Sequence, residues 1–203
     1  MSQMERQHPT GRPLPDDRSN DWPTGDAVLD LSVEPQAVEH TALINEVFEA
    51  GFDFVTGVPD SHLAGFLKAL AADERAGECF LPGTREDNCI GLAVGAYLAG
   101  ATPLVFMKSA GLGTCLDALT SLALVYRIPV VLLVSWAGHD GRDVPHHNVI
   151  GQPAPAVLQA LGVPALLSRF DDPADTAEQL RAALREAVRV SSPVAVLCAP
   201  EGE

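Results

Sequence analysis

Positive charge is scarce in this sequence. Its 203 residues include 13 lysines and arginines against 27 aspartates and glutamates, so the formal net charge at pH 7 is −14. Such a charge repels phosphate backbones and anionic membranes. Nucleic acid and membrane surfaces are therefore not expected as partners. A site for a small anionic substrate would need local cations of its own.

Patterned cysteines and long apolar runs are also missing. The four cysteines (Cys79, Cys89, Cys115 and Cys198) form no CxxC pair and have no histidine at zinc-ligand spacing, which disfavours a structural metal site. The N-terminus lacks the apolar stretch of a signal peptide, and no segment offers the ~18–20 apolar residues that span a bilayer. We predict a soluble, cytoplasmic protein with reduced thiols.

The composition is that of one folded domain with a tail. Hydrophobic residues make up 47% of the chain, enough for a packed core. Residues 1–34 are rich in proline and aspartate, carry seven acidic residues and three arginines, and show no sustained periodicity. We predict an acidic, flexible tail over 1–34 and a single domain over 35–203.

From residue 35 onward, helical patterns alternate with short apolar runs. Helices are predicted over about 36–50, 61–72, 86–99, 114–126 and 174–190, with Ser61 as the N-cap of the second. Strands are predicted over about 52–60, 78–84, 102–110, 129–138, 164–170 and 193–199. Apolar strands separated by helices indicate an α/β fold, a doubly wound parallel sheet of about six strands covered on both faces.

Ligands of such folds bind beyond the carboxyl ends of the strands. Four turns follow predicted strands there and hold most of the unusual polar residues. They are GVPDSH (57–62), GTREDN (83–88), MKSAGLGT (107–114) and WAGHDGRDVPHH (136–147). A functional site is therefore expected among these four turns.

Glu86 stands at a predicted strand-to-helix junction. In one interpretation Thr84 caps the helix, Asp87 completes a capping box, and Glu86 is simply an acid favoured by the helix dipole. In the other, the following helix is apolar on nearly every side and therefore buried, so that its first-turn acid faces an interface rather than water. The residues by themselves leave both interpretations open.

The glycine-bearing turn Gly111–Thr114 reads GLGT, but Leu116 replaces the third glycine of a dinucleotide-binding loop. A nicotinamide cofactor is therefore disfavoured. Two interpretations remain: a plain strand-to-helix turn, or a turn whose backbone approaches another ligand.

Cations are available in two of the turns. Lys108 ends an apolar strand, either as an exposed lysine or as the local cation that an anionic substrate requires. Asp143, His146 and His147 share a predicted loop. Adjacent histidines do not easily share one metal, so these residues are predicted to line a pocket or to be solvated. The GxSxG motif of serine hydrolases is absent.

Taken together, the turns resemble one family, the phosphonopyruvate and sulfopyruvate decarboxylases, which are thiamine-diphosphate enzymes. The similarity covers about residues 36–200 and is to their pyrimidine-binding domain, or to the alpha subunit where the enzyme is split. Five motifs occur in family order: GVPDS at 57–61, E-x8-G-x-Y at 86–97, M-x3-GLG at 107–113, LTSL at 119–122 and D-x-P-x-H-x3-G at 143–151.

The resemblance implies roles for particular residues. Glu86 matches the glutamate that contacts N1′ of the cofactor's aminopyrimidine and acts as its acid/base partner. Pro59, Gly111 and Leu112 match other cofactor-binding positions. The positions implied to bind substrate are Asp60, Ser61, Lys108, Ser109, His146 and His147.

The resemblance also implies a partner. Thiamine enzymes hold the diphosphate through Mg2+ bound by a GDG motif with a downstream asparagine, and the nearest match here, HDG at 139–141, lies in the wrong loop without that asparagine. A separate beta subunit holding Mg2+ is therefore implied, with the active site between subunits of a higher hetero-oligomer and no metal bound by this chain.

The expected activity is conversion of an anionic 2-oxo acid, 3-phosphonopyruvate or 3-sulfopyruvate, to an aldehyde and CO2. Two loops depart from the family pattern. This chain has MKSAGLGT at 107–114 where the family has MQNSGLGN, and it has DVPHH at 143–147 where the family has DEPQH. Substrate identity is therefore less well predicted than cofactor activation. A carboligating synthase subunit and a non-catalytic, degenerate partner subunit remain as alternatives.

Overall fold

The computed structural model describes residues 35–169 and 172–199, with the side chains of 35–39 excepted. The chain divides into two units, Met1–Ser32 and Val33–Glu203, and everything described belongs to the second. The acidic tail predicted over 1–34 lies outside the described residues.

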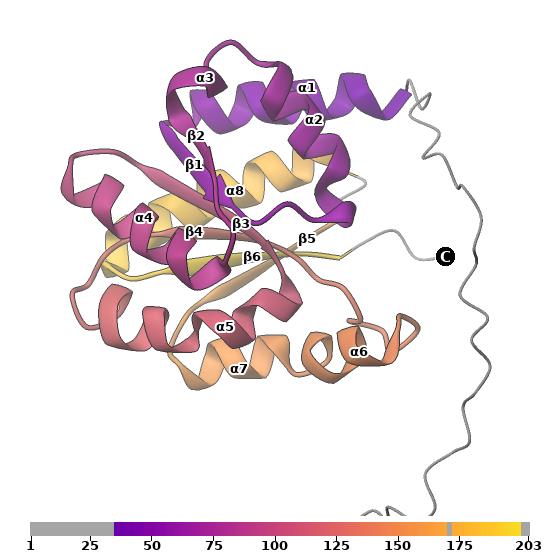
Figure 1. The fold of residues 1–203 in the computed structure, drawn as a ribbon, viewed down its shortest axis with the longest axis vertical. Coiled ribbons are helices and arrows are strands. Elements are labelled where there is room, and N and C mark those ends of the chain that lie inside the picture. Colours follow the sequence, from indigo (N-terminus) through magenta and orange to yellow (C-terminus); the bar gives the residue numbers. More distant parts are fainter. Residues whose placement is uncertain (1–34, 170–171, 200–203) are drawn as a thin grey trace, which may run out of the picture. The chain divides into compact units, whose positions relative to one another are not determined.

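The described chain is a six-stranded, fully parallel sheet with helices on both faces (Figure 1). Its strands are β1 (Phe54–Gly57), β2 (Phe80–Pro82), β3 (Pro103–Lys108), β4 (Val131–Ser135), β5 (Ala165–Arg169) and β6 (Val194–Ala199). Its α-helices are α1 (Pro35–Glu49), α2 (Ala64–Ala72), α3 (Ala76–Cys79), α4 (Glu86–Leu98), α5 (Leu112–Asp117), α6 (Pro145–Gly151), α7 (Ala154–Ala160) and α8 (Pro173–Val190). Short turns η1 (Ser61–Leu63) and η2 (Ser109–Gly111) are 3-10 helices, and η3 (Ala118–Ala123) is a π-helix that extends α5. The predicted fold class is confirmed.

The strand order is β2-β1-β3-β4-β6-β5. The chain leaves β1 toward β2 on one side and continues from β3 toward β4 on the other. The boundary between β1 and β3 is thus the topological switch point, where α/β sheets leave a crevice beyond their carboxyl ends.

Each face of the sheet has its own hydrophobic core. One core joins α1, α2 and α8 to the strand side chains that include Val55 and Phe106. The other joins α4, α5, η3 and α7 to those that include Val105 and Leu132. Adjacent strand residues point to opposite faces, which is why the central strands are apolar at every position.

Two predictions about local structure are wrong. The predicted loop that holds Asp143, His146 and His147 (residues 139–152) contains α6, because Pro145 at its first turn presets a helical φ and has no N–H to satisfy. Ser61 is not an N-cap: it opens η1, and the preceding Asp60 makes no side-chain cap hydrogen bond because its carboxylate is engaged elsewhere. The helix that begins at Glu86 packs with one side on the sheet, and Leu92 and Leu98 on it are 37% and 72% exposed in this chain. Its burial at an interface with another subunit stays a prediction.

Gly57 closes β1 where the backbone must pass next to β3. It pairs with Phe106, and a Cβ at this position would lie 2.2 Å from the Phe106 carbonyl oxygen. The strand that leads into the first site turn therefore requires glycine here.

We expect Gly57→Ala to lower the free energy of unfolding by about 1–3 kcal/mol, because backbone atoms must move to admit the methyl group. Urea denaturation measures this change. The matched control is Gly77→Ala in α3, where no described atom lies within 4 Å of an added Cβ. Equal stability of the two variants would contradict the close approach.

Candidate active site

A pocket of about 260 Å³ opens at the switch point between β1 and β3. The turn after β1, the start of α4 and the turn after β3 converge on it. Its lining residues are Val58, Pro59, Asp60, Ser61, Glu86, Lys108 and Ala110. Five of the predicted site residues are thus brought together from segments about 25 positions apart in the sequence.

Glu86 is the first residue of α4 and is partly buried. The capping-box interpretation does not describe this helix start: the N-cap residue is Arg85, without a side-chain cap, and Asp87 instead pairs with the Arg85 guanidinium at 2.9 Å. The hydroxyl of Thr114 lies within hydrogen-bond distance of two acceptors, Glu86 Oε2 at 3.1 Å and the Gly111 carbonyl oxygen at 2.9 Å. The donor beside Glu86 is therefore neutral, and its proton is shared between these two acceptors.

Gly111 gives Glu86 its space. A Cβ at Gly111 would lie 2.5 Å from Glu86 Cγ and 2.9 Å from its Oε1. The GLGT turn is therefore more than a plain connection, because its backbone approaches the carboxyl group that faces the pocket. The predicted cofactor-binding residue Leu112 has its side chain buried in the core.

Lys108 and Asp60 form an ion pair on the pocket wall. Lys108 Nζ lies 2.9 Å from Asp60 Oδ1, although the angles are not those of a hydrogen bond. The hydroxyl of Ser135 at the end of β4 donates to Asp60 Oδ2. The Asp60 side chain is only 3% exposed, so this buried carboxylate depends on both partners.

The remaining predicted residues surround the pocket without lining it. Ser109 is buried and its hydroxyl donates to the Ala137 carbonyl at 3.1 Å, which ties the turn after β3 to the segment after β4. His146 and His147 lie in α6, which packs against η2. His147 Nδ1 lies 3.0 Å from Asp143 Oδ2.

Thiol chemistry is disfavoured beside this pocket. Cys115 is fully buried below Glu86, and burial, aided by the Glu86 charge, raises the pKa of its thiol to about 12. A thiol with this pKa is neutral near pH 7 and is a weak nucleophile.

Three residues near the pocket were not singled out in the sequence. Thr114 orients Glu86, His62 faces His147 with 6.3 Å between ring centroids, and the Asn148 amide donates to the Asp143 carbonyl at 2.7 Å. Each of these residues lies within or next to a motif. The contacts of Thr114 and His62 join segments that are distant in sequence, and the contact of Asn148 depends on the helical conformation of α6. The sequence offered no signal for those contacts.

Two findings concern metals and membranes. Within 35–169 and 172–199, no three His, Cys, Asp or Glu side chains are grouped so as to hold a metal ion. None of the helices in those ranges is long and apolar enough to cross a membrane.

The fold and the site define a class: a parallel α/β domain whose switch-point pocket holds two carboxyl groups, Asp60 in an ion pair with Lys108 and Glu86 beside the Thr114 hydroxyl. Residues 40–159 match the family described as "Thiamine pyrophosphate enzyme, N-terminal TPP binding domain". The chain belongs to this family, as the resemblance of its turns predicted.

Three relatives of this chain are named as decarboxylases or as decarboxylase subunits. The chain is 33% identical to sulfopyruvate decarboxylase subunit alpha of Methanothermobacter thermautotrophicus, over 73% of this chain and 88% of that one. It is 30% identical to the protein of the same name from Methanococcus maripaludis, over 77% and 91%. It is 33% identical to phosphonopyruvate decarboxylase of Streptomyces viridochromogenes, over 50% of this chain and 25% of that one.

A solved structure gives the same fold. The chain superposes on a split gene transketolase, described as an inactive beta4 tetramer, with a TM-score of 0.56 and 17% identity. The match covers 82% of this chain and 51% of that chain.

The pocket fits one part of thiamine diphosphate. Glu86 supplies an oriented carboxyl group, the space beside it depends on Gly111 having no side chain, and Val58, Pro59 and Ala110 provide apolar surface for a flat ring. This donor set suits the aminopyrimidine.

We expect Gly111→Ala to weaken thiamine diphosphate binding by the assembled protein by about tenfold or more, because displacing the Glu86 carboxyl removes a charge-assisted hydrogen bond. Cofactor titration followed by intrinsic fluorescence measures this. Gly113→Ala is the matched control, since no described atom lies within 4 Å of its added Cβ. If the two variants bind the cofactor equally well, Gly111 does not make room for Glu86.

Proposed function

We propose that this chain is the cofactor-activating subunit of a two-subunit, thiamine-diphosphate-dependent 2-oxo-acid decarboxylase. The observation that carries the proposal is Glu86, which lies at the switch-point pocket with Gly111 and Thr114 against its carboxyl group. The family membership and the relatives named as alpha subunits support it.

Thiamine diphosphate, when bound, supplies the nucleophilic carbon and the electron sink that loss of CO2 from a 2-oxo acid requires. This chain contributes a proton-transfer group. Glu86 holds or accepts a proton at the N1′ atom of the aminopyrimidine, and Thr114 keeps the carboxyl group oriented for that exchange. Gly111, together with Pro59, leaves space for the ring beside the carboxyl group.

We propose 3-sulfopyruvate as the substrate, ahead of 3-phosphonopyruvate. Three relatives named sulfopyruvate decarboxylase subunit alpha match over 88%, 91% and 90% of their own length. The chain spans only 29% of a longer sulfopyruvate decarboxylase and 25% of the phosphonopyruvate decarboxylases. The proposal therefore follows the relatives that, like this chain, are separate alpha subunits. The products would be the corresponding aldehyde and CO2.

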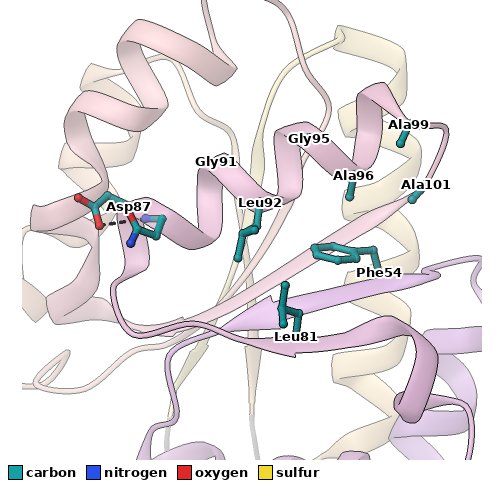
Figure 2. A pocket seen from close by; sticks show the side chains of 10 residues that line it. Phe54, Leu81, Asp87, Gly91, Leu92, Gly95, Ala96, Ala99 and Ala101 are labelled. Carbon is teal, nitrogen blue, oxygen red and sulfur yellow. Dashed lines mark hydrogen bonds between the residues drawn. The ribbon is translucent and has the colours of Figure 1, made fainter.

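A second subunit would hold the diphosphate and Mg2+. The surface for it is an apolar groove of about 830 Å³ along α4, next to the end that bears Glu86 (Figure 2). Its lining residues are Phe54, Leu81, Asp87, Asn88, Gly91, Leu92, Gly95, Ala96, Ala99 and Ala101. Because Asp87 and Asn88 immediately follow Glu86, a subunit seated in the groove would also reach the cofactor pocket.

Gly91 and Gly95 strengthen the interface proposal. Both are exposed within α4, where glycine is less favourable than alanine by about 1 kcal/mol. No described atom lies within 4 Å of a Cβ built on either residue. Since the fold of this chain does not require glycine there, close approach by another subunit explains both residues.

Glu86→Gln removes the titrating group without changing its size. We expect CO2 release from 3-sulfopyruvate by the assembled enzyme to fall by about 10²–10⁴-fold, the usual contribution of a general acid–base residue. Far-UV circular dichroism should be unchanged. Glu78→Gln, on exposed α3, is the control. Normal turnover by the Glu86 variant would exclude the proposed role.

Gly95→Leu fills the groove from the helix side. We expect the variant chain to keep the thermal unfolding midpoint of the unmodified chain. Its affinity for the partner subunit should fall by about tenfold or more, because overpacking a close interface is unfavourable. Analytical ultracentrifugation of the mixed subunits measures this. Gly77→Leu adds the same side chain to α3. Association as tight as in the unmodified pair would place the interface elsewhere.

A further inference from the structure

Lys108 is the one positively charged residue among the described residues that line the pocket. It ends β3 at the switch point, and its register partner on β4 is Ser135. Both side chains meet Asp60 in the turn after β1: Lys108 Nζ lies 2.9 Å from Asp60 Oδ1, and the Ser135 hydroxyl donates to Asp60 Oδ2. Three segments thus fix the position of one ammonium group at the pocket wall.

The two members of this ion pair are not equally accessible. The Asp60 side chain is 3% exposed, whereas the Lys108 side chain is 21% exposed. A ligand in the pocket therefore meets the ammonium group more readily than the carboxylate. The buried carboxylate in turn offsets the cost of taking the ammonium group out of water.

The ammonium group keeps donors for a ligand. A lysine has three N–H donors, and the contact with Asp60 does not have the angles of a hydrogen bond. Lys108 Nζ makes no hydrogen bond and no other ion pair with the residues that the structure describes. In a chain with a net charge of −14, such a group is a specific place for an anion.

Lysine departs from the family pattern at this position. The pattern MQNSGLGN has glutamine where this chain has Lys108. A glutamine amide donates hydrogen bonds but carries no charge. The cation is therefore an addition to the pocket, and Lys108→Gln is the substitution that tests it.

A 2-oxo acid of the proposed class carries two acid groups, and the reaction changes only one of them. The carboxylate loses its charge as it leaves as CO2, whereas the sulfonate or phosphonate keeps its charge throughout. A cation bound to the carboxylate would stabilise the substrate more than the transition state and would slow the reaction. The favourable partner for Lys108 is therefore the acid group that survives.

We propose that Lys108 binds the sulfonate or phosphonate group of the substrate, and that Asp60 is a positioning residue that holds the Lys108 ammonium group at the pocket. The inference rests on the proposed function and assigns part of its substrate specificity to one residue. Asp60 stays buried with the Ser135 hydroxyl, and Glu86 remains available for proton transfer.

Kinetics of the assembled enzyme test the role of Lys108. Lys108→Gln should raise KM for 3-sulfopyruvate by about tenfold to a hundredfold, the range for losing a hydrogen bond to a charged group. The change in kcat should stay within about threefold, because the lost contact is uniform binding. Lys68→Gln, which removes a positive charge from an exposed position of α2, is the matched control and should leave KM unchanged. An unchanged KM in the Lys108 variant would overturn the proposal.

A double variant separates loss of the cation from the effect of an unmatched Asp60. Lys108→Gln alone leaves the Asp60 carboxylate without its ion-pair partner, and that charge also repels an anionic substrate. Asp60→Asn/Lys108→Gln removes both charges. Its KM should stay about as high as that of Lys108→Gln, because the missing interaction is the cation. A return of KM to the unmodified value would mean that Lys108 only neutralises Asp60, and would overturn the proposal.

Lysine labelling gives a readout that does not depend on turnover. The sequence holds two lysines, Lys68 and Lys108, so mass spectrometry follows the acetylation of each in the assembled enzyme. The probe is 3-sulfopropanoate, which has both acid groups of 3-sulfopyruvate but no oxo group. We expect it to protect Lys108 and not Lys68. In Asp60→Asn, acetylation of Lys108 without the probe should rise, because the amine is no longer held against a carboxylate.

The labelling result separates this inference from the proposed function. Protection of Lys108 by 3-sulfopropanoate supports the subsite even if no 2-oxo acid is decarboxylated. Turnover of 3-sulfopyruvate, with Lys108 acetylated equally in the presence and absence of the probe, would overturn the subsite and leave the proposed function standing.

Discussion

The parallel pairing of β1 with β3 is the constraint on which the site depends. The two strands run in register, with Gly57 at the end of β1 opposite Phe106, and β3 continues two residues further to Lys108. Both turns therefore leave the sheet at the same edge. Because neighbouring connections diverge there, the turns leave a crevice rather than filling it. α4 packs on both strands and directs Glu86 into that crevice. A change in strand register would separate the carboxyl group from Gly111 and Lys108.

Charge around the crevice is organised pairwise. Asp60 is matched by Lys108 and Ser135, and Asp143 is matched by His147. No basic side chain among the described residues is within ion-pair distance of Glu86, which receives only the neutral Thr114 hydroxyl. This division is chemically sensible, since an acid held in a salt bridge exchanges its proton poorly. The pairs stabilise the turns, and the remaining carboxyl group is available for proton transfer.

Sequence patterns predicted the sheet well because apolar strands and turn glycines are local signals. The same patterns placed Glu86, Lys108 and Asp60 near one another, since parallel strands bring their carboxyl ends to one edge. They did not reveal that Lys108 is paired with Asp60, because that contact joins residues far apart in the chain. The helical position of His147 was also missed, since polar residues and a proline within 139–152 indicated a loop. The composition of α4 is apolar on nearly every side, so it did not indicate which side packs on the sheet and which side is exposed.

The central claim is that this chain supplies a catalytic acid to a thiamine-dependent decarboxylase that is complete only with a second subunit. The most direct measurement is CO2 release from 3-sulfopyruvate by this chain purified together with a diphosphate-binding partner, thiamine diphosphate and Mg2+. The account predicts turnover by the pair and none when either subunit is omitted. Turnover by this chain without a partner, or a pair that binds the cofactor but releases no CO2 from 3-sulfopyruvate or 3-phosphonopyruvate, would contradict it.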